Sequence, residues 1–299
     1  MELIESISQA CKCVQINEPM KHHTTFKIGG CADILCEPET TEELRNILMI
    51  AKQNNIKPMI IGNGSNLLVS DKGIRGIVIK IGDKMNDVRV DGEMITAGAG
   101  AKLKKISNAA QQSSLTGFEC LSGIPGSFGG AIYMNAGAYG AEIADIIVEV
   151  SAMTADGELI TIKKEDMQLG YRNSIFMHSD LVIVSGVIKL CTGEREKIDE
   201  KIRETTIART TKQPLEMPSA GSVFKRPEGY FAGKLIEDCD LKGYSIGGAM
   251  ISPKHAGFIV NYDNATAQDV VDLIKYTQDK VLEKFGVEIE PEIRLTGEK

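Results

Sequence analysis

The stretch Ile61-Gly62-Asn63-Gly64-Ser65-Asn66-Leu67-Leu68-Val69-Ser70-Asp71 combines an apolar strand end, a tight polar turn and a second apolar strand. Gly62 and Gly64 permit positive φ and close backbone approach, and the short polar side chains beside them add donors, so the turn is able to cradle an anion. It is not the dinucleotide-binding fingerprint, because Leu67 stands where that pattern needs a third glycine and a strand follows where it needs a helix. A plain glycine-rich β-hairpin fits the same residues, so the stretch alone leaves both interpretations open.

Length and charge restrict the classes of protein to which the chain can belong. Its 299 residues are enough for two or three domains with a large buried core. Its net charge of −7 provides no basic field for nucleic acid or an anionic membrane surface. Any anionic ligand must therefore be held by local donors.

The N-terminal residues and the cysteines indicate a reducing compartment. The first residues carry Glu2 and Glu5 on an amphipathic pattern without a signal-peptide profile, and no run approaches the roughly 18 apolar residues of a membrane span. The seven cysteines show no C-x-x-C spacing, so we expect them to be reduced and mostly packed, with no metal site. We read His22-His23 as a hydrogen-bonded loop pair, because no acidic or Cys partner sits at ligand spacing. The chain is expected to be a soluble, cytoplasmic monomer.

Hydrophobic periodicity and turn residues predict short strands interleaved with helices. Thr40-Thr-Glu-Glu43 predicts a capping box at the start of an amphipathic helix, and Asp91-Gly92 predicts the turn of a hairpin over 88–97. A polar link over 210–218 predicts a domain boundary. The other predicted helices cover the first 11 residues, 98–114, 194–209 and 267–285. The other predicted strands cover 32–37, 58–62, 76–81, 146–154, 157–162, 181–190 and 287–296.

A second glycine-rich stretch runs from Leu121 to Gly140. Pro125 fixes φ where Gly126 and Ser127 are able to present N–H groups, and the small residues 129–131 would let the backbone pack against a flat ligand. Two donor-rich loops in one domain fit an extended diphosphate better than a single phosphate.

Seven motifs in order resemble one known family, the UDP-N-acetylenolpyruvoylglucosamine reductases (UDP-N-acetylmuramate dehydrogenases). They span nearly the whole chain, and although each is weak alone, their common order and spacing leave little room for accident. The motifs are Thr25-Phe-Lys-Ile-Gly-Gly, Gly62-Asn-Gly-Ser-Asn-Leu-Leu, Ile124-Pro-Gly-Ser-Phe-Gly-Gly-Ala, Tyr171-Arg-x-Ser, Ser219-Ala-Gly-Ser-Val-Phe-Lys, His255-Ala-Gly-Phe-Ile-Val-Asn and Pro291-Glu-Ile.

The resemblance implies an α+β fold with a vanillyl-alcohol-oxidase-like (PCMH-type) FAD-binding domain and a smaller C-terminal α+β substrate domain. On this basis residues 1–20 form an N-terminal helix, 21–209 the FAD-binding region in two α+β subdomains, and 210–299 the substrate-binding domain. The implied cofactor is non-covalent FAD, with NADPH as reductant. The cofactor-binding residues implied are Gly62, Asn63, Gly64, Ser65, Asn66, Leu67, Gly98, Ile124, Pro125, Gly126, Ser127, Gly130, Ala131 and Asn135.

The chemistry that the resemblance implies is reduction of UDP-N-acetylglucosamine enolpyruvate to UDP-N-acetylmuramate, a step of bacterial peptidoglycan synthesis. Hydride from reduced flavin would reach the methylene carbon, so negative charge would develop at the adjacent carbon and spread into its carboxylate. By the resemblance Arg172 and Glu292 bracket that carboxylate, and Ser222 protonates the carbanion. Lys225 and Arg226 are candidates for holding the substrate diphosphate. For His255, a functional role and a packed position in a loop fit the sequence equally well.

Within the family this chain looks like the shorter, type II form. Only 50 positions separate Arg172 from Ser222, and strand and helix patterns fill that interval, which leaves no room for the tyrosine-bearing loop of type I proteins. Tyr230, Phe231 and Arg226 are the candidates for closing the site, with Tyr230 also a substrate contact. Two alternatives remain open at this point: another flavin oxidase or dehydrogenase on the same scaffold, and a nucleotide-sugar-binding protein without turnover.

Overall fold

A computed structural model describes residues 2–298 of the chain. These residues form two compact units, each assembled from stretches that are far apart in the sequence. Unit 1 contains 2–16, 34–63 and 76–208, and unit 2 contains 17–33, 64–75 and 209–298. The boundary crosses β1 (Val14–Pro19), β2 (Cys31–Cys36), β5 (Ile74–Lys80) and α6 (Arg195–Lys212).

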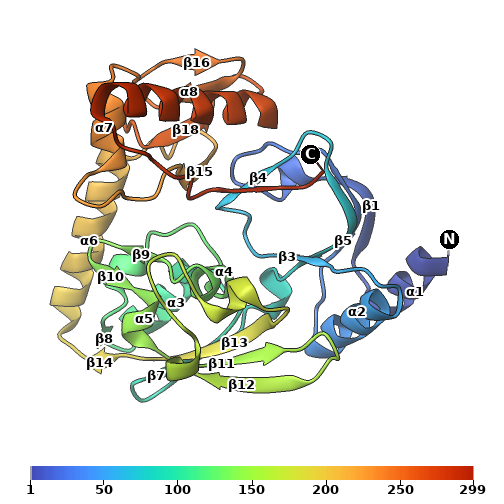
Figure 1. The fold of residues 1–299 in the computed structure, drawn as a ribbon. Coiled ribbons are helices and arrows are strands. Elements are labelled where there is room, and N and C mark those ends of the chain that lie inside the picture. Colours follow the sequence, from blue (N-terminus) through green and yellow to red (C-terminus); the bar gives the residue numbers. More distant parts are fainter. Residues whose placement is uncertain (1, 299) are drawn as a thin grey trace. The chain divides into compact units, whose positions relative to one another are not determined.

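Unit 1 begins with helix α1 (Glu2–Ala10) and also contains helix α2 (Thr41–Gln53) (Figure 1). Helix α2 starts where the Thr40–Glu43 pattern predicts a helix start. Thr40 caps α2, because its side-chain oxygen accepts the Glu43 N–H at 3.1 Å. The predicted capping box is only half formed, since the Glu43 carboxylate accepts the N–H of Glu39 at 2.9 Å instead of that of Thr40. The predicted apolar face is confirmed, with Leu44, Ile47, Leu48 and Ala51 buried.

The turn after Ile61 does not form a hairpin. Strand β3 (Met59–Ile61) pairs in parallel with β5, within the four-stranded sheet ordered β1-β2-β5-β3. Strand β4 (Leu67–Val69), on the other side of the turn, pairs in parallel with β19 (Arg294–Thr296) near the C-terminus. The hairpin interpretation is therefore wrong, because both strands find partners far away in sequence.

A five-stranded antiparallel sheet forms the second layer of unit 1, in the order β12-β11-β13-β7-β6. Its strands are β6 (Val88–Asp91), β7 (Met94–Gly98), β11 (Ile147–Met153), β12 (Leu159–Lys163) and β13 (Val182–Lys189). The predicted hairpin over 88–97 is confirmed, with Asp91 opposite Met94. Helices α3 (Leu103–Gln112) and α4 (Phe128–Tyr133) pack on this sheet (Figure 1).

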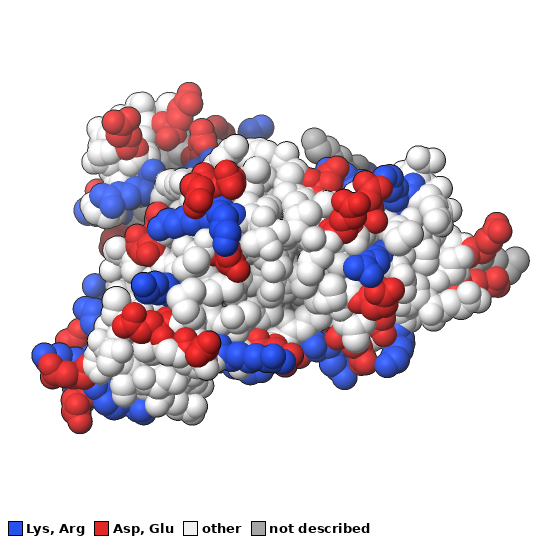
Figure 2. Space-filling view, turned by 90° about the horizontal axis from the view of Figure 1, so that it is seen from below, with Lys and Arg blue, Asp and Glu red and all other residues white. Residues whose placement is uncertain are grey.

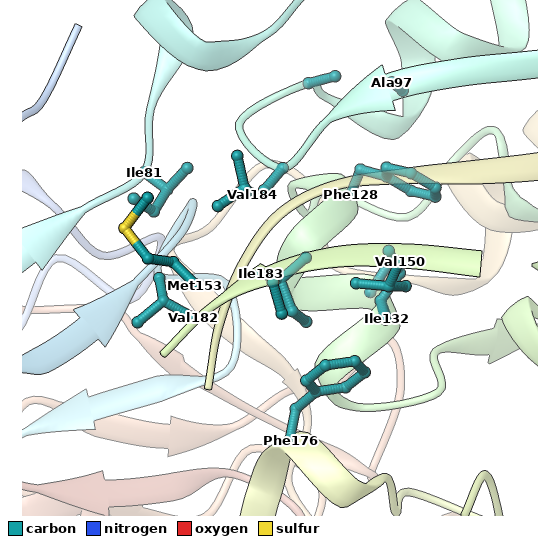
Figure 3. Close-up of a cluster of buried hydrophobic side chains, with 14 of the residues drawn as sticks. Ile81, Ala97, Phe128, Ile132, Val150, Met153, Phe176, Val182, Ile183 and Val184 are labelled. Atoms are coloured by element: carbon teal, nitrogen blue, oxygen red, sulfur yellow. The ribbon is translucent and has the colours of Figure 1, made fainter. Parts of the chain in front are cut away.

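The core of unit 1 lies between this sheet and the helices. Figure 3 shows Phe128 and Ile132 from α4 together with Val150 from β11 and Ile183 from β13, and Phe176 below them. The rings of Phe128 and Phe176 are 0% and 1% exposed. Because burying one such side chain stabilises a fold by roughly 1.5–3 kcal/mol, these contacts fix α4 against the sheet.

Unit 2 contains an antiparallel sheet, ordered β15-β18-β17-β16, with the long helix α8 (Ala267–Phe285) against β16 and β17 and the short helix α7 (Ala232–Asp238) against α8 (Figure 1). Helix α8 has the predicted bounds and a capping box between Thr266 and Asp269. A shared core joins α7 and α8 to Phe26, Ile28 and Leu68 from the N-terminal half of the chain. The strands of the sheet are β15 (Ser219–Ser222), β16 (Ser245–Ile246), β17 (Ala249–Ile251) and β18 (Phe258–Asn261).

Three predicted segments differ from the structure. Helix α6 continues to Lys212, so the first residues of the predicted polar link are helical. The predicted strand over 287–296 is reduced to β19 and one isolated bridge between Phe224 and Pro291. The glycine-rich stretch contains α4 and β9 (Gly137–Ala138). Strand β9 pairs with β10 (Ala141–Glu142), which precedes α5 (Ile143–Ile146), and β8 (Leu115–Thr116) pairs with β14 (Cys191–Thr192).

The surface carries charges of both signs, and the cysteines differ in burial. On the face drawn in Figure 2, acidic and basic side chains of the described residues are interspersed. All seven cysteines are free; Cys11 and Cys36 are buried, and Cys191 is exposed. Burial raises the pKa of the Cys36 thiol to about 12. Within 2–298, no helix combines the length and apolar character needed to cross a bilayer.

Candidate active site

The two predicted glycine-rich loops meet in unit 1. The Asn63 side-chain amide donates to the Pro125 carbonyl at 2.5 Å. A Cβ on Gly62 would lie 2.1 Å from Oγ of Ser127, so only glycine allows the two loops to approach this closely. Ser127 in turn caps α4, where its Oγ accepts the Gly130 N–H at 3.4 Å. The sequence predicted both loops, and the structure brings them together.

The peptide N–H groups of these loops fit an anionic ligand such as the diphosphate of FAD. Gly126 and Ser127 are buried, yet their N–H groups make no hydrogen bond within the described chain, and neither do those of Gly62 and Asn63. Buried N–H groups without acceptors are rare in folded proteins, and clustered ones form anion-binding concavities. The residues present therefore suit the cofactor that the fold implies.

The remaining predicted cofactor residues of unit 1 support the loops or lie behind them. Ala131 is 3% exposed in the core, and Ile124 packs against the same core while partly exposed. Gly98 ends β7 opposite Ser185, and its N–H donates to the Asp87 carbonyl at 2.8 Å.

The second half of the first loop, Gly64 to Leu67, belongs to unit 2. The Gly64 carbonyl accepts the Thr25 N–H at 3.3 Å, and Leu67 pairs with Arg294. The Asn66 amide donates to the carbonyl of Glu292 at 3.2 Å. Ser65 occupies the turn between these contacts. Within unit 2, the second half of the loop is thus fixed by Thr25, Arg294 and Glu292.

Arg172 lies in a tight turn of unit 1. Gly170 and Asn173 exchange two backbone hydrogen bonds of 3.1 Å each across this turn. Arg172 itself has φ +53°, a left-handed conformation that is uncommon for a non-glycine residue and often marks functional sites. Its guanidinium carbon lies 5.0 Å from the ring centroid of Tyr171.

Ser222 and Glu292 are brought together in unit 2. The Glu292 N–H donates to the carbonyl of Val223, the residue after Ser222, at 2.6 Å. Ser222 is exposed at the end of β15, opposite Phe258 of β18. The backbone therefore joins the predicted carboxyl group to the residue after the predicted proton donor, although 70 positions separate Ser222 from Glu292, because segments 223–225 and 290–292 run side by side.

The predicted substrate cations lie in unit 2 but differ in their surroundings. Lys225 pairs with the Glu290 carboxylate at 2.9 Å, so an anionic ligand would have to compete with that carboxylate. The guanidinium of Arg226 lies over the Phe231 ring at 4.0 Å, and its Nε donates to the Tyr230 carbonyl at 3.4 Å. The rings of Tyr230 and Phe231 are 47% and 63% exposed. The three candidates for closing the site thus form one exposed group.

His255 is a packed histidine in the structure. Its Nδ1 accepts the Gly257 N–H at 3.1 Å, and its ring meets Phe258 edge-on at 5.0 Å. Burial lowers the pKa of His255 below its ordinary value.

The predicted hydrogen-bonded loop pair at 22 and 23 has an acidic partner that the sequence analysis missed. Both histidine rings approach the same carboxylate oxygen of Glu18, His22 at 3.3 Å and His23 at 3.0 Å. The signal was present, because Glu18 lies four and five positions away and a turn with Pro19 separates it from the pair. Among the described residues no group of three or more ligand-type side chains is arranged to hold a metal ion.

Comparisons with known proteins agree on one family. The sequence profile of the UDP-N-acetylenolpyruvoylglucosamine reductase C-terminal domain matches residues 213–296, and that of an FAD binding domain matches 32–163. A UDP-N-acetylenolpyruvoylglucosamine reductase from Caldanaerobacter subterraneus is 52% identical over 95% of this chain and 94% of its own length. One from Clostridium botulinum is 50% identical over 95% and 93%.

Solved structures show the same relationship. The UDP-N-acetylenolpyruvylglucosamine reductase of Thermus caldophilus superposes with a TM-score of 0.81 at 34% identity, over 95% of this chain and 98% of that one. A more distant structure shares the fold alone: a variant of Phl p 4, a glucose oxidase, aligns with a TM-score of 0.51 at 14% identity, over 65% of this chain and 45% of that one. The fold is thus α+β, with a PCMH-type FAD-binding domain. The chain belongs to the UDP-N-acetylenolpyruvoylglucosamine reductases, a family of flavin-dependent oxidoreductases.

Proposed function

We propose that the chain reduces UDP-N-acetylglucosamine enolpyruvate to UDP-N-acetylmuramate for peptidoglycan synthesis, with non-covalent FAD as cofactor and NADPH as reductant. The observation that carries the proposal is the 2.6 Å hydrogen bond from the Glu292 N–H to the Val223 carbonyl, which joins a carboxyl group to the exposed Ser222. FAD supplies the hydride that the methylene carbon of the enolpyruvyl group receives. In this proposal the segments beyond Arg209 hold the substrate, and the loops at 62–63 and 124–127 hold the cofactor.

The role that we assign to Arg172 follows from where charge appears in the reaction. When the methylene carbon becomes a methyl group, the adjacent carbon gains negative charge, which its carboxylate shares. Arg172 supplies a permanent charge and a planar fork of donors suited to a carboxylate, and Glu292 assists on the same group. These groups act on charge that is larger in the transition state than in the ground state, so they lower the barrier.

Ser222 completes the product by transferring its hydroxyl proton to the carbon that bears the charge. The C=C double bond thereby becomes a C–C single bond, and two new C–H bonds form, one from the hydride and one from the hydroxyl proton. The alkoxide left on Ser222 regains a proton from water, since this side chain is exposed at the end of β15. Transfer from one face sets a single configuration at the new stereocentre.

The proposal is tested by following the flavin spectrum after rapid mixing of pre-reduced protein with one of two oxidants. We expect the enolpyruvyl nucleotide to restore the oxidised spectrum rapidly and to yield UDP-N-acetylmuramate by mass spectrometry, and dissolved oxygen to restore it slowly. Rapid reoxidation by oxygen with no lactyl product would instead make the chain an oxidase. Purified protein that binds the nucleotide but carries no flavin absorbance would make it a binding protein without turnover. Comparing the reduction rates with NADPH and NADH tests the choice of reductant.

A further inference from the structure

The turn that carries Arg172 is tied to one short helix, α4. Besides the two backbone bonds between Gly170 and Asn173, two side-chain hydrogen bonds tie the turn to residues at the end of α4. One comes from the Asn135 amide, which donates to the Gly170 carbonyl at 3.0 Å. The other comes from the Ser174 hydroxyl, which donates to the Tyr133 carbonyl at 2.7 Å. Both anchors end within two residues of the C-terminus of α4.

Both polar side-chain atoms of Asn135 have protein partners. Its side chain is 0% exposed, and while Nδ2 holds the turn, Oδ1 accepts the Ala144 N–H at 2.9 Å at the start of α5. Its backbone adopts φ +43°, a left-handed conformation that asparagine tolerates better than most residues. The resemblance implies a cofactor contact at Asn135, and the buried side chain directs both of its polar atoms to protein partners.

Helix α4 links this anchor to the cofactor loop. Ser127, which lies beside Gly62, is the N-cap of α4, and Asn135 follows the last turn of the helix. A helix of this length spans only about 9 Å and does not bend easily. Phe128 and Ile132 lock it into the core of unit 1 (Figure 3). The position of the Arg172 turn relative to the cofactor loop is therefore set by a short, buried connection.

We propose that Asn135 is a positioning residue for Arg172: through the Gly170 carbonyl it holds the left-handed turn in register with the loop at 124–127, and Ser174 is the second anchor of the same turn. The inference rests on the proposed function, because it takes Arg172 as the group that meets the substrate carboxylate. Displacing a group of this kind by about 1 Å is enough to slow catalysis about 10²-fold.

Asn135→Asp tests the proposal with little change of shape. The aspartate keeps an acceptor for the Ala144 N–H but faces the Gly170 carbonyl with an oxygen, so the turn loses the hydrogen bond from residue 135. We expect reoxidation of the reduced flavin by the enolpyruvyl nucleotide to slow about 10²-fold, with FAD affinity and reduction by NADPH close to wild type. In an Arg172→Ala background the same substitution should cost no further rate, because a positioning residue acts only through the residue it positions.

Asn261→Asp is the matched control. This asparagine makes the same two kinds of hydrogen bond in unit 2. Its Nδ2 donates to the Phe26 carbonyl at 3.2 Å, and its Oδ1 accepts the Ala265 N–H at 2.8 Å. Its effect on the rate should be additive with Arg172→Ala, since nothing ties it to the Arg172 turn. If Asn135→Asp fails to fold, Ser174→Ala carries the same test, because it removes the other anchor by deleting one hydroxyl.

A readout without turnover separates this inference from the proposed function. In apo protein, hydrogen exchange of the peptide covering 167–178 should quicken in Asn135→Asp and stay at the wild-type rate in Asn261→Asp. Unchanged exchange, or an equal loss of rate with and without Arg172, overturns the positioning role. A rise in the FAD dissociation constant that persists in the Arg172→Ala background also overturns it and makes Asn135 a cofactor contact. If Arg172→Ala itself leaves reoxidation unchanged, the proposed function fails, and hydrogen exchange alone then decides whether Asn135 holds the turn.

Discussion

Ser222 follows Gly221, whose φ of +81° turns the chain so that β15 shifts register against β18 between residues 219 and 222. Nothing lies within 4 Å of the place where a Gly221 side chain would sit, so the positive φ, and not crowding, requires glycine there. This local irregularity leaves Ser222 exposed while the next residue, Val223, is buried. A bulge that re-aims one side chain is common beside active sites.

Removing the Ser222 hydroxyl should affect only the second half of the reaction. Ser222→Ala should leave FAD binding and reduction by NADPH intact, because neither step needs a proton at the substrate carbon. Reoxidation by the enolpyruvyl nucleotide should slow by at least about 10²–10⁴-fold, the usual contribution of one acid–base group. Ser222→Cys should recover part of the rate, since a thiol is a stronger acid. Rapid mixing measures both steps; fast reoxidation of the alanine variant would remove Ser222 from this role.

The approach of the two glycine-rich loops predicts a pair of compensating substitutions. Gly62→Ala places a methyl group 2.1 Å from Oγ of Ser127 and 3.2 Å from its Cβ, so one loop must move. We expect the FAD dissociation constant to rise at least about tenfold, as a loss of about 1.4 kcal/mol would produce. Adding Ser127→Gly removes both atoms in the way and should restore part of the affinity, at the cost of a few tenths of a kcal/mol for the helix cap. Flavin titration by fluorescence measures all three variants, and an unaffected Gly62→Ala protein would show that the loops do not hold the cofactor.

At the scale of elements, Asp71 joins β4 to the long helix α8. Its two carboxylate oxygens accept the N–H groups of Ala267 and Gln268, at 2.8 and 3.1 Å, in the first turn of the helix. Charged acceptors at this end also interact favourably with the helix dipole. Asp71→Ala should lower the free energy of unfolding by about 1–3 kcal/mol, the usual cost of losing hydrogen bonds to a charged group. Denaturant titration measures this change, and Asp279→Ala, at an exposed acidic residue on the same helix, is the control variant. Equal effects of the two substitutions would contradict the anchoring role of Asp71.

The loop between β17 and β18 should make stability depend on pH through His255. Because burial lowers the pKa of its imidazole below the ordinary 6.5, the unfolded chain binds a proton at a higher pH than the folded chain does. The stabilising contribution of neutral His255 is complete above about pH 6.5 and decreases as the pH falls below it. Between pH 6.5 and 5 the free energy of unfolding should fall less steeply with pH in His255→Asn than in the wild type. The two slopes should differ by up to about 1.4 kcal/mol per pH unit. Urea titrations over this range give both slopes, and identical slopes would contradict the prediction.

At the scale of the whole molecule, unit 2 depends on two stretches from the N-terminal part of the chain. Phe26 and Leu68 are 0% and 1% exposed in the same core as Val270 and Leu273 of α8. A chain ending at Ala208 should therefore expose these apolar residues and bind a hydrophobic dye, and a fragment from Arg209 onward should show no cooperative unfolding transition. Dye fluorescence and thermal melts measure both. A fragment from Arg209 that melts cooperatively would mean that the C-terminal stretches fold by themselves.

Much of the local structure could be predicted from the sequence. The bounds of α8, the apolar face of α2 and the hairpin over 88–97 follow from hydrophobic period, capping residues and an Asp-Gly turn, all of which act over a few neighbouring residues. The ordered motifs also predicted the family, which the comparisons confirm. The pattern of the C-terminal segment was misleading, because an apolar run predicts a strand whether or not another strand is available to pair with it.

Tertiary structure alone decided which distant residues meet. Whether the turn after Ile61 is a hairpin depended on the partners of β3 and β4, which are β5 and β19. The sequence also held no local signal that the Asn135 amide would reach Gly170, because 35 positions separate them. Local signals act through backbone preferences and nearby side chains, whereas these pairings exist only once buried surfaces have brought the segments together. The sequence by itself therefore determined the helices, most strands and the family, and the tertiary structure determined how its loops join into candidate sites.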